Sequence, residues 1–150
     1  MRNVLFLCTG NSARSIMAEA YMNKAAAGKW AAYSAGSHPA GEPNPVALQT
    51  LRENNIPVNN QGNAPYSKSW NEFTSDDAPI MDVVVTVCDN AAGETCPIWP
   101  THSSKAPQKY HWSFPDPASA LGTDEERRAV FQQVFISIRN TINTFLNEQA

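Results

Sequence analysis

The chain has 150 residues, of which 42% are hydrophobic and 17% charged, and its formal net charge is −3. This length predicts one domain covering 1–150, with enough residues to enclose a buried core. The small negative charge and the lack of a basic run exclude nucleic acid and acidic membrane surfaces as favoured partners.

The three cysteines, Cys8, Cys88 and Cys96, stand in a chain without a visible secretory or membrane-spanning segment. The first apolar run, Val4–Leu7, is too short for either kind of segment. We therefore expect a cytoplasmic protein, in which thiols are kept reduced. The cysteines are then reactive, metal-binding or buried thiols, and not a static disulfide framework.

The predicted elements alternate between strands and helices. Val4–Leu7 and Val83–Val87 are short apolar runs typical of buried parallel strands. Thr123–Glu126 is a capping box, and apolar residues at helical spacing follow it. In chain order we expect a strand at Val4–Leu7, a helix capped by Ser12 and ending near Lys24, a strand at Ala31–Ser34, a helix from Pro45 to about Asn54, a short helix within Lys68–Phe73, a strand at Val83–Val87, a strand at Lys109–Phe114 and a long helix after Thr123.

This alternation predicts an α/β fold, a three-layer sandwich in which helices cover a parallel sheet. Ligands of such sheets bind beyond the carboxyl ends of the strands. Cys8, Cys88 and Asp116 each follow a predicted strand. We therefore expect these three side chains to meet at one edge of the sheet.

The segment from Cys8 to Ser15 joins the first predicted strand to the first predicted helix. A loop of this length wraps around one tetrahedral oxyanion, and its amides and the helix N-terminus supply positive potential. Arg14 offers a planar fork for two oxygens. The predicted oxyanion-binding residues are Thr9, Gly10, Asn11, Ser12, Ala13, Arg14 and Ser15.

The same positive potential is expected to lower the pKa of Cys8 and make its thiolate a nucleophile. Ser15 is expected to hydrogen-bond the Cys8 sulfur. A buried cysteine at the end of a strand, before an ordinary capped helix, is the alternative. That alternative explains Cys8 alone and leaves the Cys-x5-Arg-Ser pattern unexplained.

Cys8–Ser15, followed by Met17-Ala18-Glu19, resembles the phosphate loop and first helix of the low-molecular-weight protein tyrosine phosphatase superfamily. The resemblance extends over nearly the whole chain and implies a four-stranded parallel sheet flanked by helices. Asp116-Pro117 lies late in the chain, where that family keeps its general acid. The resemblance therefore implies this role for Asp116, and a structural Asp capping a turn before Pro117 is the alternative.

Within this superfamily, Thr86–Glu94, Cys96-Pro97 and His111-Trp112 resemble the thioredoxin-linked arsenate reductase branch. Asp116-Pro117 is followed by Ala118-Ser119-Ala120, where phosphatases usually carry tyrosines. The resemblance implies that Cys8 attacks arsenate and that Cys88 and then Cys96 resolve the product as disulfides. An external dithiol protein then reduces the Cys88–Cys96 disulfide.

Four alternatives remain open from the sequence. A phosphatase needs only Cys8, Arg14 and Asp116. A phosphocarrier phosphorylates a cysteine after the first strand and does not need Arg14 and Asp116 together. Cys88 and Cys96 are alternatively a buried strand-end cysteine and an incidental loop cysteine. A zinc site is a further reading, with the ligands Cys88, Cys96, His102 and His111, although their spacing matches no paired-knuckle pattern.

The expected small-molecule partner is arsenate, with phosphate and sulfate as competing oxyanions. The expected protein partner is thioredoxin or glutaredoxin, and we expect a monomer with no cofactor and no metal. Asn11, Glu19 and Ser34 match positions that help to hold potassium in some relatives. The acidic ligand that those relatives supply from the middle loop is not evident near Ser67, so a tight potassium site is not expected.

Overall fold

The computed structural model describes residues 1–58, 66–75, 77–88 and 107–149. Its strands are β1 (Arg2–Leu7), β2 (Trp30–Ala35), β3 (Val83–Thr86) and β4 (Gln108–His111), and they form one 4-stranded sheet in the order β2-β1-β3-β4. All neighbouring pairs are parallel. The predicted four-stranded parallel sheet is confirmed.

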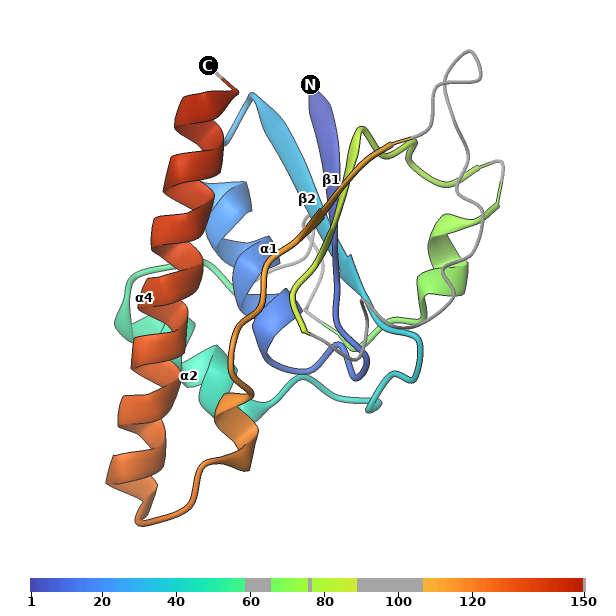
Figure 1. Ribbon diagram of the computed structural model, residues 1–150. Helices are drawn as coiled ribbons and strands as arrows, with labels where there is room; N and C mark the ends of the chain where they lie inside the picture. The colour runs from blue at the N-terminus through green and yellow to red at the C-terminus, as the bar shows by residue number, and fades with distance from the viewer. Residues whose placement is uncertain (59–65, 76, 89–106, 150) are drawn as a thin grey trace.

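Helices α1 (Arg14–Ala25), α2 (Pro45–Glu53) and α4 (Asp124–Glu148) cover one face of this sheet, and the short 3-10 helix η1 (Trp70–Phe73) covers the other (Figure 1). The alternation of side chains along β1 explains the two covers. Val4 and Phe6 belong to the core under the three helices, whereas Leu5 and Leu7 pack with residues of the η1 side. β1 is therefore buried on both faces.

Some of the predicted helix and strand ends agree with the structure, and others differ from it. The capping box is confirmed: Thr123 Oγ1 accepts a hydrogen bond from the Glu126 amide, and the Glu126 carboxylate accepts one from the Thr123 amide. The cap predicted at Ser12 is wrong, because α1 has Ala13 at its N-cap and no side-chain cap. The Ser12 carbonyl is instead bound by the Asn44 amide, which keeps the loop outside the helix.

Strand β4 also ends earlier than predicted, at His111 instead of Phe114. Trp112 makes the last backbone hydrogen bond to β3, through its amide and the Thr86 carbonyl. The following chain contains Pro115 and Pro117, which have no N–H to extend a strand ladder. It bends instead into the 3-10 helix η2 (Pro117–Ser119).

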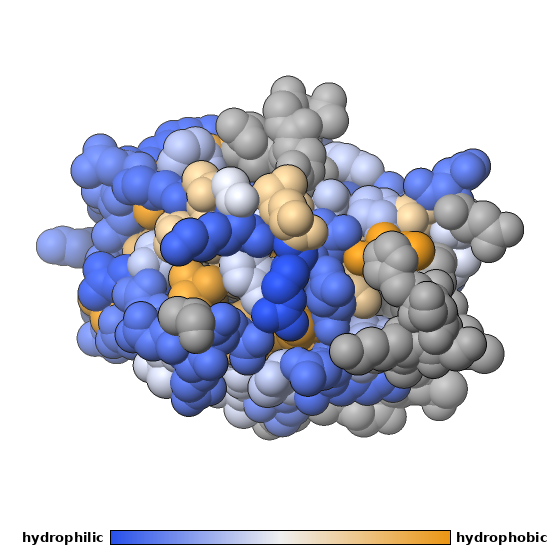
Figure 2. Space-filling model, turned by 90° about the horizontal axis from the view of Figure 1, so that it is seen from above, coloured by the Kyte–Doolittle hydropathy of each residue, from blue (hydrophilic) through white to orange (hydrophobic). Residues whose placement is uncertain are grey.

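The carboxyl ends of the parallel strands bring Cys8, Cys88 and the segment after β4 to one edge of the sheet. The opposite end of the molecule is mostly hydrophilic, and its apolar residues form small separate spots (Figure 2). In the part of the chain that the structure describes, no helix has the length and apolar character to cross a bilayer.

Gly36, directly after β2, lies against the backbone that follows β1. A Cβ atom on Gly36 would lie 2.4 Å from the Thr9 carbonyl oxygen and 2.6 Å from the Cys8 carbonyl oxygen. These are backbone atoms, so they cannot rotate away as a flexible side chain would. The loop after β1 can therefore sit this close to β2 only because residue 36 has no side chain.

We predict that Gly36→Ala lowers the free energy of unfolding by about 2 kcal/mol, because the methyl group overpacks a backbone crossing. It should also weaken inorganic phosphate binding, because the loop after Cys8 must shift. Gly28→Ala is the matched control: its φ of +82° strains the backbone, but a Cβ there meets nothing within 4 Å. Urea unfolding and calorimetric phosphate titration measure both effects. Unchanged phosphate affinity in Gly36→Ala would contradict this role.

Candidate active site

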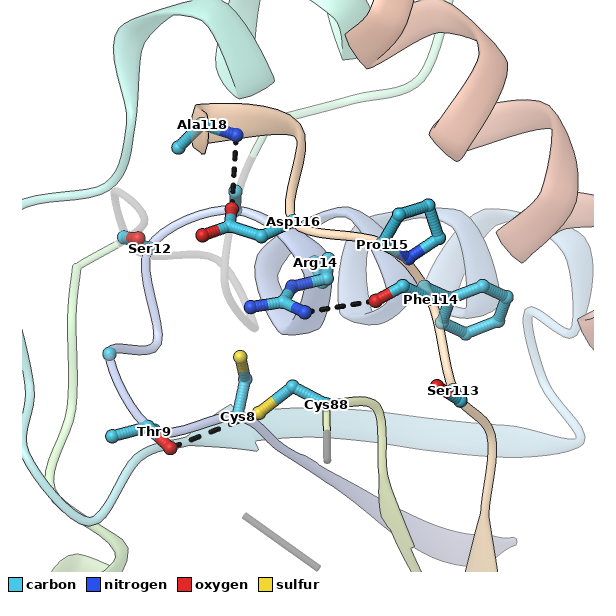
Figure 3. A pocket seen from close by; sticks show the side chains of 12 residues that line it. Cys8, Thr9, Ser12, Arg14, Cys88, Ser113, Phe114, Pro115, Asp116 and Ala118 are labelled. Atoms are coloured by element: carbon cyan, nitrogen blue, oxygen red, sulfur yellow. Dashed lines mark hydrogen bonds between the residues drawn. The ribbon is translucent and has the colours of Figure 1, made fainter. Parts of the chain in front are cut away.

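A pocket of about 670 Å³ opens at the carboxyl edge of the sheet (Figure 3). Three segments that are distant in sequence line it: the loop after β1, the end of β3 and the segment after β4. Its lining includes most of the residues that the sequence singled out, namely Cys8, Thr9, Gly10, Ser12, Ala13, Arg14, Cys88 and Asp116. Asn11 and Ser15 do not line it, although both belong to the same segment of chain.

The backbone of the Cys8–Arg14 loop is held from outside through its carbonyl groups. The Thr9 carbonyl accepts a hydrogen bond from the His38 amide, and the Gly10 carbonyl accepts one from the Ala40 amide, both at 2.9 Å. The Ser12 carbonyl accepts a third, from the Asn44 amide at 2.8 Å. In a trans peptide the N–H points away from the C=O. Carbonyls bound on the outside therefore direct loop amides toward the pocket, as anion binding requires.

Asn11 holds a bend of this loop in a left-handed backbone conformation. Its φ is 46°, in the left-handed region that Asn tolerates better than most residues. Its side chain is fully buried: Oδ1 accepts a hydrogen bond from the Lys68 amide at 2.6 Å, and Nδ2 donates one to Ser15 Oγ at 2.9 Å. The hydrogen bond predicted between Ser15 and the Cys8 sulfur is therefore replaced by one with Asn11. The side chains of Asn11 and Ser15 therefore support the loop from the side away from the pocket.

Arg14 is the first residue of α1, so its guanidinium lies beside the helix N-terminus. Its Nη1 donates a hydrogen bond to the Phe114 carbonyl at 2.9 Å, across the pocket mouth (Figure 3). This contact holds the fork in place without using its other donors. Because Phe114 is two residues before Asp116, the same contact links the cationic side of the pocket to the carboxylate side.

Cys8 and Cys88 lie together at the floor of the pocket, where their exposed fractions are 6% and 3% (Figure 3). Cys8 follows β1 and Cys88 follows β3, so the parallel pairing of these neighbouring strands brings the two thiols side by side. Thr9 Oγ1 lies 3.9 Å from the Cys88 sulfur, within hydrogen-bonding reach of sulfur. The sequence prediction that the two cysteines share one edge is confirmed by this geometry.

The pKa of Cys8 is raised above its usual range, first by a hydrogen bond with the Cys88 side chain and then by burial. Arg14 and the Gly10 amide act in the opposite direction. The predicted lowering of the Cys8 pKa is therefore wrong, because that prediction took the field of the loop alone and left out the second thiol.

Asp116 lines the pocket and also caps η2. Its Oδ1 accepts a hydrogen bond from the Ala118 amide at 3.0 Å, and its Oδ2 accepts one from Ser119 Oγ at 3.1 Å. Asp116 therefore has the structural role that the sequence left as an alternative, the capping of a turn at Pro117. Asp116 also lines the pocket, and its role as the general acid stays a prediction.

Cys96, the third cysteine, lies outside the described residues, as does His102 of the alternative zinc site. The described residues contain no group of three or more His, Cys, Asp or Glu side chains that would hold a metal ion. His111 contacts Thr86 instead, with its Nδ1 lying 2.7 Å from the threonine hydroxyl.

The model of the low molecular weight phosphotyrosine protein phosphatase family matches residues 3–150. The chain belongs to this family. This membership agrees with the loop between β1 and α1 and with the order of the strands, but the family name does not by itself fix the reaction of this member.

Proteins similar to this chain include both arsenate reductases and tyrosine phosphatases. An arsenate reductase of Oceanobacillus iheyensis is 40% identical over 142 residues, which cover 95% of this chain and 93% of that protein. A solved structure of an arsenate reductase in the phosphate binding state is 26% identical, has a TM-score of 0.71 and is covered completely, as is this chain. A low molecular weight protein tyrosine phosphatase from T. tengcongensis has a TM-score of 0.73 at 21% identity, with 99% of each chain covered, and shows the fold alone.

Sequence reasoning missed Gly36, Lys68 and the Phe114 carbonyl. All three support the Cys8–Arg14 loop or Arg14 from segments far away in sequence. The position of Gly36 could have indicated its role, because a glycine at a strand often marks a place where another backbone approaches closely. Lys68-Ser69-Trp70 resembles a segment of many reductases of this branch, but nothing in it indicated burial, because a lysine in a polar segment ordinarily predicts a solvated side chain.

A buried carboxylate beneath this loop predicts how stability depends on pH. Burial raises the pKa of Glu19 from 4.5 to about 7, while Lys68 and Ser34 act to lower it. The folded chain therefore holds a proton that the unfolded chain has released, and stability falls as pH rises from about 4.5 to about 7. Glu19→Gln should remove this slope, which amounts to roughly 3 kcal/mol over the interval.

Urea unfolding at a series of pH values measures the slope, with Glu53→Gln as a control on an exposed side chain of α2. The control should keep the slope of the wild type. Parallel profiles for wild type and Glu19→Gln would mean that Glu19 does not take up a proton on folding, contrary to the prediction.

Proposed function

We propose that the chain is an arsenate reductase, which converts arsenate to arsenite through a relay of three cysteines. The observation that carries this proposal is the second thiol at the floor of the pocket, where Cys88 lies beside the predicted nucleophile Cys8. Phosphoester hydrolysis has no use for a second thiol. Reduction of arsenate takes up two electrons, which two thiols supply when they form one disulfide.

In the proposed first step, arsenate sits against the inward-facing amides of the Cys8–Arg14 loop, with two of its oxygens on the Arg14 guanidinium. The Cys8 thiol passes its proton to an arsenate oxygen, its sulfur attacks arsenic, and one arsenic–oxygen bond breaks. Asp116 gives its proton to the departing oxygen, which leaves as water. The product is a covalent adduct between the Cys8 sulfur and arsenic, which is still pentavalent.

In the second step, the Cys88 thiolate attacks the Cys8 sulfur. A Cys8–Cys88 disulfide forms, and the electron pair of the sulfur–arsenic bond stays on arsenic, which leaves as trivalent arsenite. Cys96 then attacks the Cys88 sulfur, so that a Cys88–Cys96 disulfide forms and the Cys8 thiolate is released. Cys96 enters this step from the sequence alone, because it lies outside the described residues.

An external dithiol protein returns the relay to its reduced form by exchange with the Cys88–Cys96 disulfide. We propose thioredoxin for this role, with glutaredoxin as the variant route, and a cytoplasmic setting in which both operate on reduced thiols. We also propose that residues 1–150 act as one unit and as a monomer. The oxyanion pocket implies that phosphate and sulfate compete with arsenate, because the three share shape and charge.

A phosphatase is the second candidate, because the family to which the chain belongs is named for that activity. It would use Cys8 as the nucleophile, Arg14 as the anion fork and Asp116 as the acid, and it would leave Cys88 idle. The two functions therefore differ in one residue of the described pocket, which makes Cys88 the position to test.

We predict that reduced wild-type protein oxidises NADPH in the presence of arsenate, thioredoxin and thioredoxin reductase. Cys8→Ser, Cys88→Ser and Cys96→Ser should each lower this rate at least about a hundredfold, because each removes one link of the relay. Hydrolysis of an aryl phosphate is the control reaction, and only Cys8→Ser should abolish it. Arsenate-dependent turnover that survives in Cys88→Ser would refute the three-cysteine relay, and its absence in the wild type would refute the reductase.

Asp116→Asn separates the general acid from the helix cap. Asparagine keeps an oxygen for the Ala118 amide but has no carboxyl proton to give. We predict that it slows arsenate-dependent formation of the Cys8–Cys88 disulfide by about a hundredfold in single turnover. Ser119→Ala removes the other hydrogen bond of Asp116 and should leave this rate near that of the wild type. Equal rates in Asp116→Asn and wild type would leave Asp116 with the cap alone.

A further inference from the structure

A buried ion pair lies behind the pocket and takes no part in the proposed reaction. Lys68 Nζ is 3.8 Å from Glu19 Oε2, and each side chain has an exposed fraction of 2%. Neither residue lines the pocket. Charged side chains are rarely buried to this degree without a reason, since their removal from water costs several kcal/mol per ion.

Among the described residues, Lys68 is the cation in contact with the Glu19 carboxylate. Lys68 Nζ donates a hydrogen bond to the Tyr66 carbonyl at 3.2 Å and lies 4.6 Å from the centre of the Tyr66 ring. Within the described chain, no hydrogen bond of 3.5 Å or less reaches the buried Glu19 Oε2 or Ser34 Oγ, although Ser34 lies near enough to help lower the pKa of Glu19. Burial lowers the pKa of Lys68, whereas Glu19 and Glu72 act to raise it. The negative charge of Glu19 thus helps to keep the ammonium protonated.

The segment that carries Lys68 is also the segment that braces the Cys8–Arg14 loop. The Lys68 amide donates to Asn11 Oδ1 at 2.6 Å, and Ser67 Oγ donates to the Gly10 carbonyl at 2.9 Å. The Lys68 carbonyl accepts from the Gly36 amide at 2.8 Å. One residue therefore contacts the loop through its backbone and α1 through its side chain.

Glu19 lies on α1, the helix that begins with Arg14. Attraction between Glu19 and Lys68 therefore draws the bracing segment toward the helix that carries the anion fork. Asn11, in its left-handed conformation, connects the bracing segment to α1, because its side chain hydrogen-bonds both the Lys68 amide and Ser15 Oγ. Loss of the ammonium would leave a buried carboxylate without its cation and would loosen the segment that holds Asn11.

We propose that Lys68 is a positioning residue, whose ammonium serves as a built-in cation that holds the Cys8–Arg14 loop in its anion-binding form. The proposal rests on the oxyanion role of this loop in the proposed function. It implies that a small free cation can replace the ammonium when the lysine side chain is cut short. The space left by the side chain would then be a cation site with Glu19 Oε2 and Ser34 Oγ as ligands.

Chemical rescue tests this proposal, with inorganic phosphate as the titrated ligand and isothermal calorimetry at pH 8 as the readout. Ammonium chloride is compared with choline chloride at equal concentration, because choline is too large for the space. In choline, Lys68→Ala should bind phosphate about tenfold more weakly than wild type, and ammonium should restore most of that loss. Wild type should bind equally in both salts.

Two variants separate a cation site from general stabilisation. Lys68→Met fills the space with an uncharged side chain, so it should bind phosphate weakly in both salts. The double variant Lys68→Ala with Glu19→Gln keeps the space but removes the charged ligand, so ammonium should not rescue it. Rescue of equal size in the double variant, or wild-type affinity of Lys68→Ala in choline, would overturn the proposal.

The melting temperature without phosphate keeps this test separate from the proposed function. Ammonium should raise the melting temperature of Lys68→Ala by several degrees, and it should leave Lys68→Met and the double variant unchanged. If wild type does not bind phosphate, the oxyanion site fails, and the melting temperatures still decide whether the ammonium of Lys68 is replaceable. No ammonium effect on Lys68→Ala in either measurement would overturn the proposal.

Discussion

The carbonyl groups of the Cys8–Arg14 loop point away from the pocket and accept hydrogen bonds there, and the rest of the site depends on this constraint. A short loop that presents its amides to an anion must turn its carbonyls the other way, and buried carbonyls need partners. His38, Ala40 and Asn44 supply these partners from one continuous stretch of backbone after β2. That stretch can reach the loop because Gly36 lets the two backbones cross in close contact. The chain after β2 is therefore part of the anion site, although it contributes no side chain to the pocket.

The two faces of the sheet have different tasks. The helical face supplies most of the apolar core, including Phe131, Phe135 and Ile138 of α4. Among the described residues, the other face holds η1 and the segment around Lys68, whose polar contacts reach the loop. A substitution near Lys68 can therefore disturb anion binding while the main core stays packed.

Local signals in the sequence predicted the elements whose causes are local. The run Val83–Val87, the Thr123 capping box and the alternation of strands with helices led to the correct fold and to a common edge for Cys8 and Cys88. The errors arise where distant residues decide. Ser12 is not a helix cap, because the Asn44 amide engages its backbone, and the Cys8 pKa is raised, because Cys88 stands beside it. Neither partner is visible within a local window of sequence.

The proposed reaction explains why two thiols lie side by side in a family known for phosphate chemistry. In a hydrolase, a thiol against the nucleophile is a liability, since the pair is easily oxidised to a disulfide that blocks the pocket. In the reductase the same bond is an intermediate that carries two electrons away from the active cysteine. The parallel pairing of β1 with β3 fixes this contact in the fold. The step that distinguishes the two reactions therefore depends on Cys88, two residues after the end of β3, while the anion loop and its braces serve both equally.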